Sequence, residues 1–131
     1  MLREIDVRRL IHHPYIIRLL DIFENAKYFY IVTENIEGMG LLDYMNFKSF
    51  DVPEIRIKKV VYQVGLAIHC LQLFFIIHRD IRHDNFFMNS LRDDSSPKLV
   101  DFCLARAIGP YERCYEPFGH ISYCAPEVLD K

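Results

Sequence analysis

The stretch from Pro53 to Phe74 constrains the fold more than any other part of this chain, because its apolar residues repeat with the period of an α-helix. Side chains three or four residues apart lie on the same side of a helix. The apolar residues with this spacing are Ile57, Val60, Val61, Val64, Ile68 and Leu71. Pro53 suits the first turn, where a missing N–H costs nothing. The sequence therefore predicts one long amphipathic helix against which other elements pack.

Shorter elements are expected on both sides of this helix. A helix over Arg3–His12 should end at Pro14, because the residue before a proline is disfavoured in the α region. The remaining elements are predicted from β-branched and aromatic runs, glycines and polar turns. They are a hairpin of Tyr15–Phe23 and Tyr28–Thr33, a short helix over Leu41–Phe47, and short strands over Phe86–Met88 and Lys98–Val100. A strand pair, then helices, then a loop-rich region to Glu127 indicates an α+β fold.

Composition narrows the classes of function. A formal net charge of −2 gives no basic surface of the kind that binds nucleic acid or an anionic membrane. The longest apolar run, Leu71–Ile77, is interrupted by Gln72 and is too short to span a bilayer. The four cysteines do not have the C-x-x-C spacing of a zinc site. We therefore expect a soluble, cytoplasmic protein with reduced thiols.

Three polar residues in the second half are candidates for chemistry. Asp80 and Asn85 fall in one expected loop, and Asp101 follows the last expected strand. A turn over residues 92–97 would bring Asp101 beside Asn85, where a carboxylate and an amide oxygen suit Mg²⁺. Asp80 would then accept a proton from a hydroxyl, which completes the equipment for phosphoryl transfer. Taken singly, each residue is better explained by a role in forming turns.

The same residues belong to three motifs that occur together. The motifs are His78-Arg79-Asp80 with Asn85, Asp101-Phe102-Cys103, and Ala125-Pro126-Glu127. In order and spacing they resemble the H-R-D-x-x-x-x-N, D-F-G and A-P-E motifs of the eukaryotic-type protein kinase catalytic domain. The resemblance covers essentially the whole chain. It implies an enzyme that uses ATP and Mg²⁺ and whose partner is a protein substrate.

The resemblance also implies a partial bilobal kinase fold that is truncated at both ends. Residues 1–37 would form the end of the N-terminal lobe and the hinge, and residues 38–131 the first part of the C-terminal lobe through the activation segment. Five residues besides Asp101 would contribute to the ATP site. They are Glu4 as the helix glutamate, Thr33 as the gatekeeper, Glu34 and Ile36 as hinge residues whose backbone binds adenine, and Phe87 beneath the adenine ring.

Catalytic roles are implied for residues of the second half. These are Asp80 as the base toward the substrate hydroxyl, Asn85 and Asp101 as Mg²⁺ ligands, Arg82 as the cation on the transferred phosphate, and His78 and Phe102 as members of the apolar stack that aligns the two lobes.

Several residues depart from the family pattern. Cys103 replaces the glycine of D-F-G, whose missing side chain permits unusual backbone angles. His120 replaces a threonine that supports the catalytic aspartate in Ser/Thr kinases, and Arg8 replaces an apolar residue of the stack. The Gly-rich phosphate loop, the strand lysine that pairs with Glu4, and the helices after Glu127 are expected to lie in neighbouring sequence.

Two functions stay open on these residues. The first is a fragment of an ATP-dependent protein kinase, for which Gly119 and Tyr123 favour Ser/Thr specificity while Arg82 and His120 favour Tyr. The second is a catalytically inactive pseudokinase or protein-interaction module, which Cys103 and the missing lysine favour.

The activation segment contains no Ser or Thr between Asp101 and Ser122. The resemblance implies that Arg79 receives a negative charge that orders this segment. The candidates are phosphorylated Tyr111 or Tyr115, or the carboxylate of Glu112 or Glu116. We hypothesise that a glutamate supplies the charge, against the alternative of a solvated segment with no fixed contact.

Overall fold

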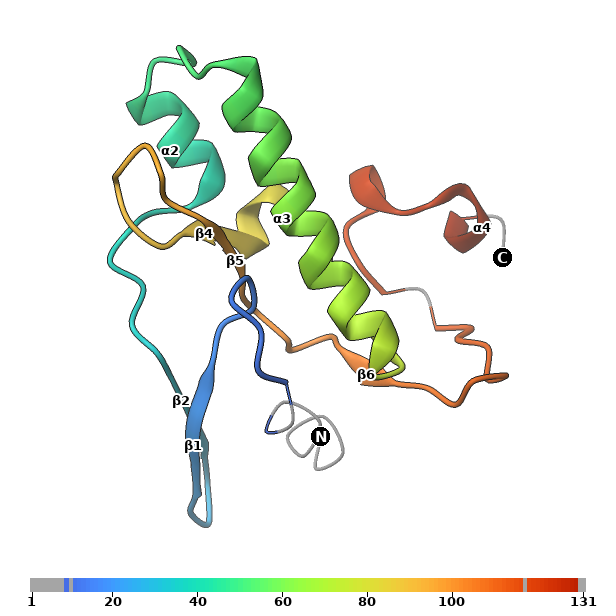
Figure 1. Ribbon diagram of the computed structural model, residues 1–131. Coiled ribbons are helices and arrows are strands. Elements are labelled where there is room, and N and C mark those ends of the chain that lie inside the picture. The colour runs from blue at the N-terminus through green and yellow to red at the C-terminus, as the bar shows by residue number, and fades with distance from the viewer. Residues whose placement is uncertain (1–8, 10, 117, 130–131) are drawn as a thin grey trace.

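The computed structural model describes residues 9, 11–116 and 118–129. Among these residues the strands form three antiparallel pairs, β1 with β2, β3 with β6, and β4 with β5, and the helices lie beside them (Figure 1). The elements are β1 (Leu19–Glu24), β2 (Phe29–Thr33), α2 (Leu41–Phe47), α3 (Glu54–Leu73), β3 (Ile76–Ile77), β4 (Phe86–Met88), β5 (Pro97–Leu99), β6 (Arg106–Ala107) and α4 (Pro126–Leu129), with 3-10 turns at His83–Asn85 and Ile121–Tyr123. This arrangement confirms the predicted α+β class.

The helix expected over Arg3–His12 falls mostly outside the described residues, as do Glu4 and Arg8. Helix α2 has the predicted bounds, and α3 differs from its prediction by one residue at each end. Among the described residues, no helix is long and apolar enough to cross a membrane.

Helix α3 is buried along a narrower stripe than its apolar pattern predicts. Its buried residues are Gln63, Ala67 and Leu71, whereas Ile57 and Val61 are 42% and 64% exposed. The apolar residues Ile57 and Val61, near the start of the helix, are thus not part of the buried core. The contacts of α3 with β3 and β5 join its buried residues to the rest of the chain.

The β1–β2 hairpin projects away from the helices (Figure 1). Its turn is held by Asn25, whose side-chain oxygen accepts hydrogen bonds from the backbone N–H groups of Lys27 at 2.9 Å and Tyr28 at 2.8 Å. An asparagine whose side chain bonds to the backbone two or three residues ahead is a common way to fix a tight turn. The predicted hairpin is thus present.

The first strand begins at Leu19 rather than at Tyr15 as predicted. The preceding segment pairs with β5 instead: the N–H of Leu99 donates to the carbonyl of Tyr15, and the N–H of Ile17 donates to the carbonyl of Leu99, both at 2.9 Å. The aromatic and β-branched residues at 15–17 are therefore extended, but their partner is distant in sequence. This pairing ties the N-terminal part of the chain to the strand that leads to Asp101.

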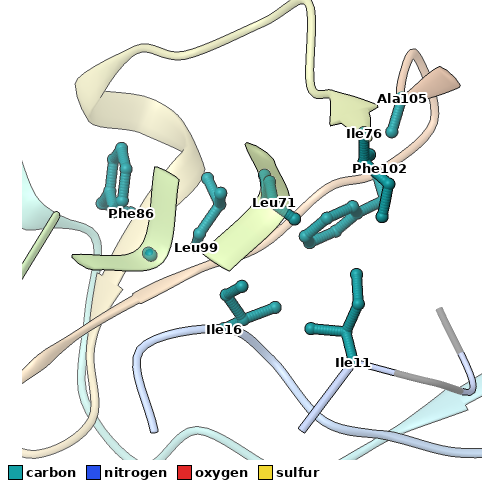
Figure 2. Packing of buried hydrophobic residues seen from close by; sticks show 9 residues of the cluster. Ile11, Ile16, Leu71, Ile76, Phe86, Leu99, Phe102 and Ala105 are labelled. Atoms are coloured by element: carbon teal, nitrogen blue, oxygen red, sulfur yellow. The ribbon is translucent and has the colours of Figure 1, made fainter. Parts of the chain in front are cut away.

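An apolar cluster joins segments between Ile11 and Ala105 (Figure 2). Leu99 on β5 is fully buried, and the cluster surrounds it with side chains from the N-terminal segment, α3, β3, β4 and the segment after β5. The buried members are Ile11, Ile16, Ala67, Leu71, Ile76, Phe86, Leu99, Phe102 and Ala105. Because β4 and β5 flank the candidate site, this packing fixes the position of the loops that carry it.

Candidate active site

Asp80 and Asn85 lie in the loop between β3 and β4, and the 3-10 turn at His83–Asn85 closes that loop. Asn85 is buried, and its Nδ2 donates to Oδ2 of Asp80 at 2.7 Å and to the carbonyl oxygen of Asp80 at 2.8 Å. These two bonds fix the amide of Asn85 and the carboxylate of Asp80 relative to each other. Both bonds use the amide nitrogen, which leaves the amide oxygen Oδ1 as the atom of this side chain that could accept a metal ion.

Asp101 is brought to the same place by the β4–β5 pair. Beyond the strands, the N–H of Val100 donates to the carbonyl of Asn85 at 2.9 Å, so Asp101 directly follows a residue bonded to Asn85. The backbone of Asp101 is left-handed, with φ of 53°, which costs about 1 to 3 kcal/mol for a residue with a side chain. Its Oδ1 accepts the N–H of Cys103 at 3.1 Å, which supports this conformation.

The left-handed angle falls on Asp101 and not on Cys103, which is absent from the non-glycine residues with positive φ in the described chain. The side chain at 103 therefore does not strain the backbone here, although glycine was expected to be needed. Phe102 is buried and meets His78 with ring centroids 4.9 Å apart. The His78 ring also hydrogen-bonds the carbonyl of Val100 through Nε2 at 3.2 Å. These contacts join residues 78–85, called the catalytic loop after the motif that they resemble, to the segment after β5.

Arg82 has a partner that the sequence did not single out. Its Nη2 lies 2.6 Å from Oδ2 of Asp84, and that same oxygen lies 3.1 Å from Nδ1 of His83. On the other side of the ring, Nε2 of His83 is 3.3 Å from the hydroxyl of Tyr123. Asp84 thus competes with any phosphate for the Arg82 guanidinium. This ion pair joins residues two positions apart. The only sequence feature that could have predicted it is the acidic residue that closely follows Arg82.

The hinge residues lie between β2 and α2, close to the β4–β5 pair. Oε1 of Glu34 accepts from Nζ of Lys98 at 2.6 Å and from the N–H of Arg18 at 2.8 Å, and its own N–H donates to the carbonyl of Arg18. Burial alone would raise the pKa of Glu34, but the hydrogen bond from Lys98, with the Arg18 N–H and both positive charges, lowers it. Lys98 pairs across the strands with Phe87, so Glu34 is anchored next to that residue.

At Gly38 the backbone of the hinge passes very close to the backbone of β4. A Cβ at this position would overlap the carbonyl group of Met88, so no residue with a side chain fits without moving backbone. The N–H of Met88 also donates to the carbonyl of Met39 at 2.8 Å. Thr33 and Ile36, the other predicted adenine-site residues, are half-buried on either side of Glu34. Neither shows a side-chain bond that would define a role.

The activation segment contacts the catalytic loop through charged groups. Nη1 of Arg79 lies 2.8 Å from Oε2 of Glu116, and Nη1 of Arg106 lies 3.0 Å from the same oxygen. Nη2 of Arg106 pairs with Oε1 of Glu112 at 2.7 Å. Of the two glutamates expected near Arg79, Glu116 is therefore the one in direct contact, and Glu112 reaches Arg106.

The end of the segment folds back toward Asp80. Nδ1 of His120 accepts the N–H of Ser122 at 3.3 Å, which begins the 3-10 turn before Ala125. Pro126 and Glu127 start the short helix α4. Between this turn and the catalytic loop lies a cavity of about 250 Å³, which Asp80 and Glu116 help to line. A molecule that lies along the activation segment can therefore reach Asp80, the candidate base, through this cavity.

The candidate Mg²⁺ ligands form a small set. Among the described residues, no group of three or more His, Cys, Asp or Glu side chains could hold a metal ion by itself. Asn85 and Asp101 supply one amide oxygen and one carboxylate, which are hard oxygen donors. Such a set fits a Mg²⁺ ion that takes its other ligands from phosphate and water.

Comparisons with known proteins cover the whole chain. The family model described as the protein kinase domain matches residues 1–131. CDPK-related kinase 3 of Arabidopsis thaliana is 38% identical over 96% of the chain, and the probable serine/threonine-protein kinase 2 of Plasmodium falciparum is 33% identical over 96% of it. The chain spans 22% and 24% of the length of these two relatives. A CDPK-related protein kinase of Daucus carota is 33% identical over 98% of the chain, which spans 22% of its length.

Proposed function

The chain belongs to the protein kinase domain family, and we propose that it carries the catalytic-loop part of an enzyme that transfers the γ-phosphate of ATP to a protein hydroxyl. The observation that carries the proposal is the pair of hydrogen bonds from Asn85 to Asp80. They hold the candidate base and a candidate metal ligand together, and the β4–β5 pair adds Asp101 beside them.

Asp80 would accept the proton of the attacking hydroxyl. The bond from Nδ2 of Asn85 occupies Oδ2 of Asp80 and orients the carboxylate, so Oδ1 is the oxygen that we assign to the substrate. A base held in this way saves the entropy of orienting it in each turnover. The adjacent cavity gives a hydroxyl-bearing segment room to approach.

Asn85 and Asp101 would hold Mg²⁺ through Oδ1 of the amide and the carboxylate. When bound, the ion would neutralise charge on the phosphate oxygens of ATP. The left-handed backbone of Asp101 supports this role, because strained backbone persists where surrounding structure enforces it and is concentrated at functional sites. The adenine would lie near Phe87, against the hinge backbone of Glu34 and Ile36 next to Thr33.

Arg82 would supply a cation for the transferred phosphate. Its guanidinium is paired with Asp84 at 2.6 Å, so a phosphate must displace or share that carboxylate. Arginine suits the task because its planar fork keeps its charge at every physiological pH. Glu4, expected to pair with a lysine from neighbouring sequence, lies outside the described residues.

We propose Ser/Thr specificity because the Plasmodium relative is named a serine/threonine-protein kinase and because of Gly119 and Tyr123. The four cysteines are free in the structure, which is compatible with the proposed cytoplasmic location.

A test of the nucleotide site is the thermal shift of the chain on adding ATP, with and without Mg²⁺. We expect a Mg²⁺-dependent rise in Tm that is lost in Asp101→Asn and kept in Asp94→Asn, a matched change in an exposed turn. An equal shift in both variants would rule out Asp101 as the metal ligand.

The second candidate is a pseudokinase that binds partners without catalysis. The pairing of Arg82 with Asp84 and the replacement of threonine by His120 favour it. The replacement of the D-F-G glycine by Cys103 was one argument for a pseudokinase. Cys103 has no positive φ, which weakens that argument. A Mg²⁺-dependent shift without phosphate transfer, measured in the full-length protein, would decide for the pseudokinase.

A further inference from the structure

We propose that His83 is a positioning residue with two contacts. One ring nitrogen holds Tyr123, in the wall of the cavity beside Asp80, and the other takes over Asp84 when Arg82 moves to a phosphate. This rests on the proposed function, because Arg82 is the residue assigned there to the transferred phosphate. It is carried by the position of one imidazole ring between a hydroxyl and a carboxylate.

The ring of His83 lies between polar groups from two parts of the chain. Its Nε2 is 3.3 Å from the hydroxyl of Tyr123, forty residues away. Its Nδ1 is 3.1 Å from Oδ2 of Asp84. In a neutral imidazole one nitrogen carries the proton and the other accepts a hydrogen bond. Because a carboxylate only accepts, we assign the proton to Nδ1, and Nε2 then accepts the hydrogen of the tyrosine hydroxyl.

The carboxylate of Asp84 is shared between His83 and Arg82. The oxygen that faces Nδ1 also lies 2.6 Å from Nη2 of Arg82. A phosphate that binds Arg82 must draw the guanidinium away from this oxygen. The Nδ1 proton of His83 stays beside the carboxylate when that happens, so Asp84 keeps a donor. His83 therefore lowers the free energy needed to release Arg82.

Two buried donors in this group lack an aligned hydrogen bond within the described residues. They are Nδ1 of His83, although it lies within ion-pair distance of Asp84, and Nε of Arg82. Such donors are rare in folded proteins, because each one costs free energy. Turning the carboxylate of Asp84 toward His83 would satisfy Nδ1. The released guanidinium of Arg82 would offer Nε together with Nη2 to a phosphate.

Tyr123 is held by neighbouring side chains on more than one side. Its ring centroid is 5.8 Å from that of His83 and 5.7 Å from that of His120, with an edge-to-face arrangement in both pairs. The guanidinium of Arg82 lies 6.0 Å from the same centroid. Both kinds of contact are attractive. Tyr123 and His120 line the cavity beside Asp80, so His83 fixes one wall of the space that a substrate would enter.

The exposure of these side chains separates positioning from stability. The side chains of His83 and Asp84 are 37% and 45% exposed, and polar contacts at such exposure contribute little to folding. A small displacement of groups beside the reacting atoms, by contrast, changes the rate strongly. Substitutions at His83 should therefore alter kinetics more than Tm.

Two amide substitutions at His83 separate its contacts. The amide group of glutamine lies as many bonds from Cα as Nε2 does, and that of asparagine matches Nδ1. His83→Gln should thus keep the bond with Tyr123 and lose the donor for Asp84, and His83→Asn should do the reverse. Tyr123→Phe removes the hydroxyl alone. The matched controls are His69→Asn and Tyr62→Phe, at exposed positions on α3.

Steady-state phosphate transfer by the full-length protein to dephosphorylated casein, at saturating ATP and Mg²⁺, measures both contacts. His83→Asn and Tyr123→Phe should raise KM for casein roughly two- to tenfold, the factor that one hydrogen bond supplies, with kcat kept. His83→Gln should lower kcat by a similar factor and keep KM, because Asp84 then holds Arg82 more strongly. The controls should match wild type. Equal effects of the two His83 variants on KM and kcat, or no effect of either, overturn the proposal.

Hydrogen exchange of the full-length protein without nucleotide tests the Tyr123 contact apart from activity. The reporters are the amides of Ser122 and Tyr123, which both bond to His120. They should exchange roughly two- to tenfold faster in Tyr123→Phe and His83→Asn, and at the wild-type rate in His83→Gln and Tyr62→Phe. The double variant His83→Asn/Tyr123→Phe should exchange like the single variants, since all three lose the same contact. Additive acceleration would contradict the proposed contact.

The two experiments distinguish this inference from the proposed function. If wild type transfers no phosphate, the proposed function fails and the exchange of Ser122 and Tyr123 still decides whether His83 holds the tyrosine. If wild type transfers phosphate but the two His83 variants behave alike, the proposed function stands and the inference fails. Should His83→Asn unfold the protein, Tyr123→Phe decides in its place, because it keeps every carbon atom of the side chain.

Discussion

Replacing Leu99 by alanine probes the connection between the core and the candidate site. Leu99 is fully buried at the centre of the apolar cluster, between the N-terminal segment, α3 and β4 (Figure 2). Its backbone bonds to Tyr15 and Ile17 do not use the side chain, so the substitution removes packing and leaves the strand pairing in place. Asp101 is two residues further along the chain.

The expected cost follows from the burial. A buried leucine replaced by alanine loses about 2 to 5 kcal/mol, which combines lost transfer energy with the cavity left behind. Leu99 has 0% exposure and neighbours on several elements, so we expect about 3 kcal/mol. With a urea m-value of about 2 kcal/mol/M, the midpoint would fall by about 1.5 M.

Urea unfolding followed by far-UV circular dichroism measures this shift, since the chain has no tryptophan to report by fluorescence. Leu73→Ala is the matched control, because Leu73 is 65% exposed at the end of α3 and should cost less than about 0.5 kcal/mol. If Leu99→Ala shifted the midpoint no more than Leu73→Ala, Leu99 would not be part of the core that positions Asp101.

Two further predictions concern the hinge. Gly38→Ala should lower Tm by several degrees, because the new Cβ overlaps the Met88 carbonyl, whereas Gly65→Ala, where nothing lies within 4 Å, should be neutral or stabilising; differential scanning calorimetry distinguishes the two. Glu34→Gln should lower Tm at pH 7 and much less at pH 3. The lowered pKa of Glu34 means that its bond with Lys98 adds stability above the ordinary pKa and is lost as pH falls through the folded-state value. A Tm difference that is the same at both pH values would contradict this role.

Local patterns predicted the regular elements well. The short helix at Leu41–Phe47 and the long helix α3 follow from glycine breaks and helical periodicity, which depend on neighbouring residues alone. The turn between β4 and β5 was expected from its polar residues, and its strands lie within one residue of their predicted bounds. Helical periodicity did not show that Ile57 and Val61 stay exposed, because burial depends on segments that are distant in sequence.

Contacts between distant segments could not be predicted in the same way. The pairing of Tyr15–Ile17 with Leu99 joins residues more than eighty positions apart, and no local pattern distinguishes it from a longer first strand. The bond between Glu34 and Lys98 could not be predicted either, because these residues are also far apart in the sequence. The expected turn at residues 92–97 indicated that Asp101 lies beside Asn85, and the family resemblance added the roles of Asp80, Asn85 and Asp101. Their assigned roles stay predictions.

Phosphate transfer tests the central claim most directly. The full-length protein would be incubated with radiolabelled ATP, Mg²⁺ and a generic protein substrate, in wild type, Asp80→Asn and Asp94→Asn. The account predicts Mg²⁺-dependent labelling in wild type and Asp94→Asn, and a loss of about 100-fold or more in Asp80→Asn, the scale of a lost general base. Equal labelling in wild type and Asp80→Asn would contradict the assignment of Asp80 as the base.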